Sequence, residues 1–299
     1  MRILTVDIGT GTQDIFLYDS RLDLENGFKL ILPSPTMIVH RQIKEATRLQ
    51  TPILLTGHQM GGGPSAWAIE AHAKEGLPVY MTPEAAATIN DELEKVEALG
   101  IKIVSEDESR QLSDAIKIEL HDFDFSTIAK TFEDYGVSLN DLDAVAVAVF
   151  DHGAAPAGVS DRQFRFDYLE ERIRTRNSLS SFAYLSTNVP KIMSRLQAVA
   201  DSATSLDCPL ILMDTAPAAV LGATLDSVVA KHQHKIVVNI GNFHTIAFRL
   251  MESTIEGVFE HHTGEIDLPG LESYILDLAD GSLQHEDIFN DMGHGALML

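Results

Sequence analysis

Cysteine is almost absent from this 299-residue chain, in which Cys208 is the single example. One thiol cannot form an intrachain disulfide, which fits a reducing compartment. It also excludes a protein-built iron–sulfur cluster, because such clusters need several thiolate ligands. The first residues show no secretory signal pattern, and no apolar run approaches the roughly 20 residues of a membrane-spanning helix. These absences together predict a cytoplasmic protein.

Basic residues are also scarce. The chain has 22 Lys and Arg against 44 Asp and Glu, a formal net charge of −22. Nucleic acids and anionic membranes both recruit clusters of Lys and Arg, so we expect neither as a partner of this acidic protein. Hydrophobic residues make up 45% of the chain, which supplies a core, and the length favours two lobes. The partners left open are a small-molecule substrate of unknown identity and further copies of the chain in a homo-oligomer.

Apolar and amphipathic segments alternate along the sequence, which predicts an α/β fold. Strands are expected at 52–56, 79–81, 101–104, 144–150 and 210–213, and helices from about 65, at 83–99, 161–176, 188–205 and 216–225. Ser, Asn and Pro interrupt the pattern within 177–190. We therefore place an N-terminal lobe at 1–185, with the first hairpin and the substrate loops, and a C-terminal lobe at 186–299.

Two segments predict β-hairpins with glycine at the bend, over residues 3–18 and 236–248. Their bends are Asp7-Ile8-Gly9-Thr10-Gly11-Thr12 and Asn239-Ile240-Gly241-Asn242. A glycine turn after a strand presents backbone N–H groups that can hold phosphate oxygens, and Asp7 can hold Mg²⁺. Neither bend is a Walker loop or a dinucleotide fingerprint, because the lysine, the third glycine and the following helix are missing. A tight hairpin without a ligand is the alternative.

These segments resemble motifs of the actin, heat-shock chaperone and sugar kinase ATPases. Asp7–Thr12 resembles the first phosphate motif, Val237–Ala247 the second, Thr215–Ala223 the connecting helix and Gly293–Ala296 the adenosine motif. The resemblance implies two ribonuclease-H-like lobes with a central cleft, and ATP or ADP with Mg²⁺ as cofactors. The residues that it implies for the cofactor are Gly9, Thr10, Gly11, Thr12, Asn239, Gly241, Asn242, Gly293 and Gly295.

Two departures qualify this resemblance. The superfamily has an acid where this chain has Asn239, so nucleotide turnover is expected to be slow or absent. Other stretches, such as GHQMGGGPSAW and DHGAAPAGVSDRQFRF, resemble an uncharacterised prokaryotic family that is sometimes labelled a pyruvate formate-lyase activating enzyme. That label implies radical chemistry on a three-cysteine iron–sulfur cluster, which Cys208 alone cannot build.

Asp151-His152-Gly153 follows the apolar run at 144–150 and is the next candidate. A carboxylate at a strand end can act as a general base and a metal ligand, so Asp151 and Asp7 are the predicted catalytic and Mg²⁺-binding residues. The alternative is an Asp that caps the turn before Gly153.

Substrate recognition is predicted on two further segments. The loop 57–65 has three consecutive glycines before a helix, where free N–H groups bind anions; an irregular surface loop is the alternative. In the helix at 161–176, two arginines precede the acidic residues and can bind a carboxylate or phosphate, although a solvated face with ion pairs is the simpler interpretation. The predicted substrate residues are His58, Gly61, Gly62, Gly63, His152, Arg162 and Arg165.

The twelve histidines raise the question of a metal site. No H-E-x-x-H spacing occurs, and neighbours such as His261 and His262 point apart on any regular element, which disfavours a zinc site. Trp67 and the aromatic residues of 164–168 are expected in the core.

A Mg²⁺-dependent ATPase or small-molecule kinase is the leading hypothesis. The alternatives are a non-catalytic nucleotide-binding or small-ligand module, and a nucleotide-independent hydrolase that uses Asp151 and His152.

Overall fold

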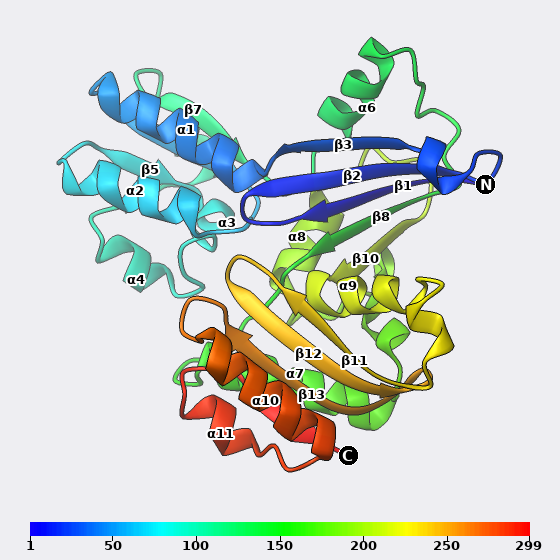
Figure 1. Ribbon diagram of the computed structural model, residues 1–299. Helices are drawn as coiled ribbons and strands as arrows, with labels where there is room; N and C mark the ends of the chain where they lie inside the picture. Colours follow the sequence, from blue (N-terminus) through cyan, green and yellow to red (C-terminus); the bar gives the residue numbers. More distant parts are fainter. The chain divides into compact units, whose positions relative to one another are not determined.

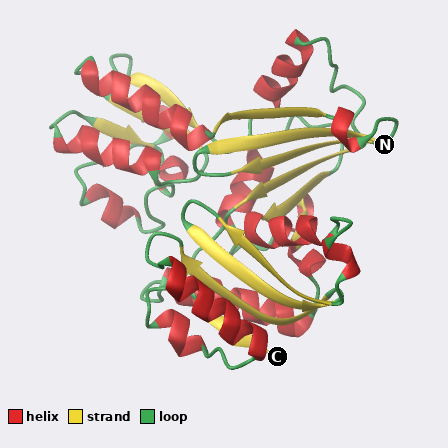
Figure 2. Cartoon of the chain, viewed as in Figure 1, coloured by secondary structure: helices red, strands yellow, loops and turns green.

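The computed structural model describes all residues from Met1 to Leu299. It is a mixed α/β protein, as the alternating pattern predicts (Figures 1 and 2). The chain forms two compact units: unit 1 comprises 1–150 and 185–212, and unit 2 comprises 151–184 and 213–299. The sequence predicts one boundary, at 185/186, whereas the chain passes between the units three times. None of the helices combines the length and the apolarity needed to cross a membrane.

The first hairpin lies in a six-stranded sheet with the order β3-β2-β1-β8-β10-β9. Strand β1 pairs antiparallel with β2, with Asp7 opposite Asp14, and parallel with β8 on its other side. This confirms the hairpin over 3–18. The strands are β1 (Arg2–Ile8), β2 (Thr12–Asp19), β3 (Phe28–Pro33), β8 (Ala144–Val149), β9 (Ala183–Leu185) and β10 (Leu210–Asp214).

A second, parallel sheet with the order β6-β5-β4-β7 lies between β3 and β8 in the sequence. Helices α1 and α2 pack side by side against it (Figure 1). Its core includes Ile43, Ile53, Leu55, Ile69 and Met81, all fully buried. The strands are β4 (Ile53–Gly57), β5 (Val79–Met81), β6 (Lys102–Ile103) and β7 (Ile116–Leu120), and the helices of unit 1 are α1 (Pro35–Arg48), α2 (Pro64–Lys74), α3 (Pro83–Ala86), α4 (Leu93–Glu97), α5 (Glu106–Ser109), α6 (Phe125–Asp134) and α8 (Ser194–Ser202).

Two local predictions in unit 1 are wrong. The helix expected over 83–99 is split into α3 and α4, because Asn90 Oδ1 accepts a hydrogen bond from Glu92 N–H at 2.9 Å in an Asx-type turn. Trp67, expected in the core, is 58% exposed, because α2 buries the face that carries Ala68, Ile69 and His72.

Unit 2 contains the second hairpin, in a four-stranded antiparallel sheet with the order β11-β12-β13-β14. Helix α10 packs on β12 and β13 (Figure 1), over a core that includes Ala247, Phe259, Leu278 and Ile288. Phe166 and Tyr168 are buried, as expected. The strands are β11 (His234–Ile240), β12 (His244–Met251), β13 (Thr254–His262) and β14 (Gly295–Met298), and the helices are α7 (Asp161–Thr175), α9 (Thr215–Thr224), α10 (Leu268–Asp280) and α11 (His285–Phe289).

His72, fully buried in α2, is expected to make unit 1 acid-sensitive. Its Nδ1 lies 2.8 Å from Thr47 Oγ1, and burial lowers the pKa of His72 below 6.5, although Glu75 acts in the opposite direction. Below pH 6.5 the unfolded chain therefore binds a proton that the folded chain does not. The free energy of unfolding falls with falling pH in this range, with a limiting slope of about 1.4 kcal/mol per pH unit.

The fluorescence of Trp67, on the same helix, can follow urea unfolding at pH 7.5 and pH 5.5. His72→Gln should lose less stability than the wild type between these two pH values. The exposed His232→Gln serves as the control and should behave as the wild type does. Equal losses in all three proteins would contradict the prediction.

Candidate functional site

The two hairpin bends share one backbone hydrogen-bond pattern. Gly9 N–H donates to the Thr12 carbonyl at 3.0 Å, and Gly241 N–H donates to the His244 carbonyl at 2.9 Å. A Cβ at either glycine would lie 3.0–3.1 Å from that carbonyl oxygen, so glycine keeps both turns tight. Each bend follows the first strand of a hairpin, one in each unit.

The bends present polar groups to solvent. Asp7 at the end of β1 is exposed, Gly9, Thr10 and Gly11 are half-buried, and Thr12 is exposed. At the second bend Asn239 and Gly241 are half-buried and Asn242 is exposed. The predicted phosphate-binding positions are thus accessible within each unit.

The segment expected to bind adenosine is enclosed by its own unit. Gly293, His294 and Gly295 are buried between α11 and β14. A Cβ at Gly293 would lie 2.5 Å from Ile288, and one at Gly295 would lie 2.5 Å from His285. These glycines allow close packing of the chain on itself. Nucleotide binding by Gly293 and Gly295 stays a prediction.

Asp151 is buried directly after β8 and caps the following turn. Its Oδ1 accepts a hydrogen bond from Gly153 N–H at 2.8 Å. This is the turn-capping role that the sequence allows as the alternative to catalysis. Gly153 has a φ of +78°. Its own N–H donates to Asp214 Oδ2 at 3.2 Å. General-base and metal roles for Asp151 stay predictions.

Arg165, predicted to bind substrate, is completely buried in an ion-pair network of unit 2. It donates to Asp214 Oδ2 at 2.8 Å, to Asp214 Oδ1 and Glu260 Oε2 at 3.1 Å each, and to the Asp151 carbonyl at 3.0 Å. Burial raises the pKa of Asp214 in spite of this pairing. Burial alone would lower the pKa of Arg165, but the two carboxylates outweigh it and raise that pKa. Recognition of substrate by Arg165 would have to break these contacts.

Arg162 also binds its own unit. Its Nη1 donates to the Gly293 carbonyl at 2.7 Å and to the Phe289 carbonyl at 3.3 Å, and the guanidinium lies over the Phe289 ring. The side chain therefore ties α7 to the segment that carries Gly293.

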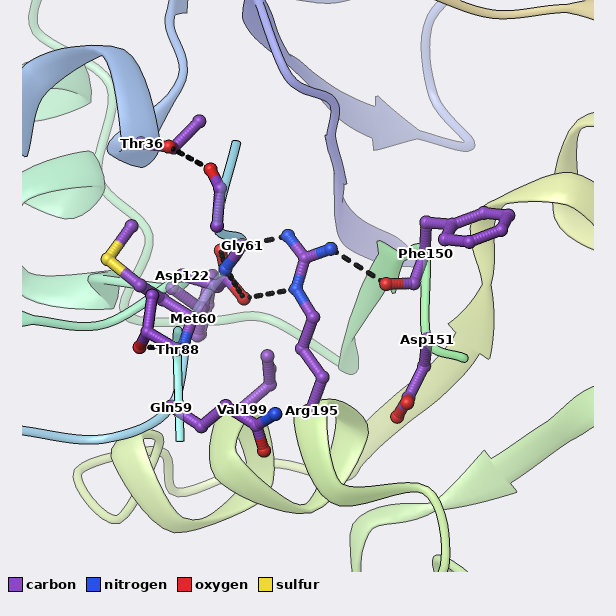
Figure 3. Close-up of polar contacts among 12 residues, drawn as sticks. Thr36, Gln59, Met60, Gly61, Thr88, Asp122, Phe150, Asp151, Arg195 and Val199 are labelled. Atoms are coloured by element: carbon purple, nitrogen blue, oxygen red, sulfur yellow. Dashed lines mark hydrogen bonds and ion pairs between the residues drawn. The ribbon is translucent and has the colours of Figure 1, made fainter. Parts of the chain in front are cut away.

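The glycine-rich loop of unit 1 is held by a buried carboxylate (Figure 3). Gly61 N–H donates to both oxygens of Asp122, at 3.1 and 3.2 Å, and Arg195 donates to the same carboxylate at 2.6 and 3.0 Å. Arg195 also donates to the Phe150 carbonyl at 2.7 Å. The chain thus supplies its own anion to the Gly61 amide.

The other glycines of this loop also meet neighbouring groups. A Cβ at Gly61 would lie 2.5 Å from Arg195 Nη2, one at Gly62 would lie 2.9 Å from the Thr88 carbonyl, and Gly63 has a φ of +60°. His58 Nδ1 lies 3.2 Å from Glu84 Oε2. Close packing is enough to explain the glycine run, and substrate binding by this loop stays a prediction.

Four histidines of unit 2 gather in one place, which the sequence did not predict. His152, His244 and His294 each offer a ring nitrogen, and these atoms all lie within 4.8 Å of one another. The ring centroid of His262 lies 4.7 Å from that of His294 and 5.1 Å from that of His244. Of the predicted site residues, only His152 belongs to this cluster.

The environment disfavours the charged form of three of these imidazoles, those of His244, His262 and His294. Burial, followed by neighbouring histidines and Arg165, lowers the pKa of His294 to about 2. Burial also lowers the pKa of His244 and of His262. Neutral imidazole is the form that binds metal ions, and lowered pKa values favour that form in His244, His262 and His294.

The register of β12 and β13 explains why the sequence does not reveal that His244 and His262 face each other. Met251 pairs with Thr254 and Leu250 with Ile255, but Arg249 pairs with Gly257. This irregularity places His262 opposite His244, whereas an uninterrupted ladder would place His261 there. The sequence does show histidines at similar distances on either side of the turn between β12 and β13. The bulge changes which of them face each other, so the sequence alone does not give the pair.

Comparison with known proteins gives one family. Residues 60–299 match the model of a family described as "Putative pyruvate format-lyase activating enzyme (DUF1786)". A comparison with the curated proteins finds no match. Since the match covers more than half of the chain, the protein belongs to this family.

Proposed function

We propose that the protein binds ATP or ADP with Mg²⁺, as a Mg²⁺-dependent ATPase or small-molecule kinase of the actin-like class. The observation that carries this proposal is the pair of matching hairpin bends at Gly9 and Gly241, one in each unit. The Thr10 and Gly11 amides donate none of the backbone hydrogen bonds of the first bend. Such amides can cradle phosphate oxygens.

The strand arrangement of unit 1 also supports the proposal. The implied ribonuclease-H-like lobe places an antiparallel hairpin beside parallel strands, and β1 pairs antiparallel with β2 and parallel with β8. Unit 2 supports the proposal less. Its fourth strand, β14, pairs antiparallel with β13, so this sheet has no parallel strand beside the hairpin.

The scarcity of basic residues in the C-terminal part of the chain makes Mg²⁺-dependent nucleotide binding part of the proposal. From Cys208 to Leu299 there are three basic and 13 acidic residues, and none of the basic ones follows Arg249. Phosphate charge would then be neutralised by Mg²⁺ and backbone N–H groups. Exposed Asp7 is the group that we assign to Mg²⁺, with Asp151 as a further candidate.

The activity in the family description is not part of the proposal. An activating enzyme of that kind would need an iron–sulfur cluster with several thiolate ligands. Cys208, half-buried, is the only thiol in the chain, so its residues do not fit such a cluster.

Thermal unfolding with nucleotide tests the proposal. Mg-ATP or Mg-ADP at 100 times its Kd should stabilise the folded state by about 2.7 kcal/mol, which raises the Tm by several degrees. EDTA should abolish the shift, and Asp7→Asn should reduce it. Asp14→Asn, which removes a charge opposite Asp7 in the same hairpin, is the matched control and should keep it. A Tm that responds to no nucleotide would refute the proposal.

Asn239 favours one alternative, a nucleotide-binding module without turnover, because an amide cannot act as a base. A measurement of phosphate release from ATP distinguishes an ATPase from a nucleotide-binding module without turnover. Binding without release, altered by Asp7→Asn only in affinity, would assign the non-catalytic function.

A further inference from the structure

Three imidazoles converge within unit 2 without any ligand yet assigned to them. His152 follows β8, His244 begins β12 and His294 directly precedes β14. Their ligand nitrogens lie within 4.8 Å of one another. The rings of His152 and His294 are nearly parallel, with an interplanar angle of 12°, and His244 meets His294 edge-on at 77°. Segments far apart in the sequence thus bring donors of one chemical type together.

His294 provides an independent observation. It is completely buried, and neither of its ring nitrogens has a hydrogen-bond partner. Leaving a buried polar group unsatisfied destabilises the folded state, so such a group in a folded protein needs an explanation. Its Nδ1 lies 4.0 Å from Glu260 Oε2, beyond hydrogen-bonding distance, so neither ring nitrogen is occupied by that carboxylate.

We propose that His152, His244 and His294 form a binding site for a divalent transition-metal ion of the zinc class, with one nitrogen donated by each residue. Imidazole suits zinc, copper, iron and nickel, whereas Mg²⁺ prefers oxygen ligands. Three protein ligands leave one position for water or a further group. The ring of His262 borders the site.

The distances are compatible with such an ion after a modest contraction. Zinc binds imidazole nitrogen at about 2.0–2.1 Å, which in a tetrahedral site places the nitrogens roughly 3.3 Å apart. The nitrogens of the cluster lie within 4.8 Å of one another, and side-chain rotation can close the remaining difference. The site is separate from the Mg²⁺–nucleotide proposal, because it contains no carboxylate of Asp7 or Asp151.

Metal titration of the full chain, without an affinity tag or nucleotide, tests this inference. The protein is stripped with a chelator and titrated with Zn²⁺ or with Co²⁺, whose visible absorption reports its ligands. One ion per chain is expected, and excess Mg²⁺ should not displace Co²⁺. Loss of a direct ligand should weaken binding by more than the 10–100-fold typical of outer-shell changes, so His152→Ala and His294→Ala should each reduce affinity at least about 100-fold.

Two controls separate the cluster from histidines in general. His234→Ala alters an exposed histidine, and His261→Gln alters a buried one beside His262; both should keep wild-type affinity. If His294→Ala fails to fold, His152→Ala carries the test, because His152 is only partly buried. Absence of stoichiometric Zn²⁺ or Co²⁺ binding, displacement by Mg²⁺, or unchanged affinity in His152→Ala would overturn the inference. A nucleotide response has no bearing on these outcomes.

Discussion

Replacing Arg165 by methionine should lower the free energy of unfolding by about 3–5 kcal/mol, because it leaves two buried carboxylates without their cation. Asp214 and Glu260 are both buried, and Arg165 donates to each of them. Without the guanidinium, these acids must ionise in a poorly solvated site or take up protons. Far-UV circular dichroism during urea unfolding measures the loss.

The matched control is Arg174→Met, on the same helix. Arg174 pairs with Glu170 at 2.7 Å on the surface, where such pairs contribute at most about 1 kcal/mol. Adding Glu260→Gln to Arg165→Met should recover part of the lost stability, because one uncompensated charge disappears. A loss from Arg165→Met no larger than that from Arg174→Met would show that the network adds little to stability.

Asp122→Ala should have a comparable effect in unit 1. Its carboxylate is buried and accepts from Arg195 and from Gly61 N–H (Figure 3). Its removal takes the carboxylate away from a largely buried guanidinium and the acceptor away from a loop amide. We expect a loss of about 3–5 kcal/mol. Trp67, the single tryptophan, lies on α2 directly after this loop, so its fluorescence reports the change locally.

Asp107→Ala is the control for this prediction. Asp107 pairs with Arg110 at 3.0 Å, and both side chains are exposed. Its replacement should change stability by less than about 1 kcal/mol. In Asp122→Ala the loop 57–65 should also become cleavable by protease at a urea concentration that leaves the wild type intact. If the loop in Asp122→Ala resists the protease as well as it does in the wild type, Asp122 does not anchor it.

Local patterns in the sequence determined much of the fold. Both hairpins could be predicted, because glycine at the bend and apolar residues on either side are short-range signals. Alternating segments gave the α/β class. The split of the helix expected over 83–99 and the exposure of Trp67 could not be predicted from periodicity, since a local Asx turn and the choice of buried face decide them.

The candidate site depends more strongly on contacts between distant residues. Arg165 appears in the sequence as one arginine of a charged helix, and only packing against Asp214 and Glu260 makes it a buried ion-pair centre. Gly61 appears as a free loop amide, but Asp122, 61 residues later, already occupies it.

The sequence by itself determined the acidic composition, the single thiol that excludes an iron–sulfur cluster, and the two glycine bends. The tertiary structure alone decided that the chain passes three times between two units and that four histidines meet in one of them. For His244 and His262, the physical reason is the register of β12 and β13. Side chains alternate across a strand, so one extra residue opposite Arg249 moves His262 to the position facing His244.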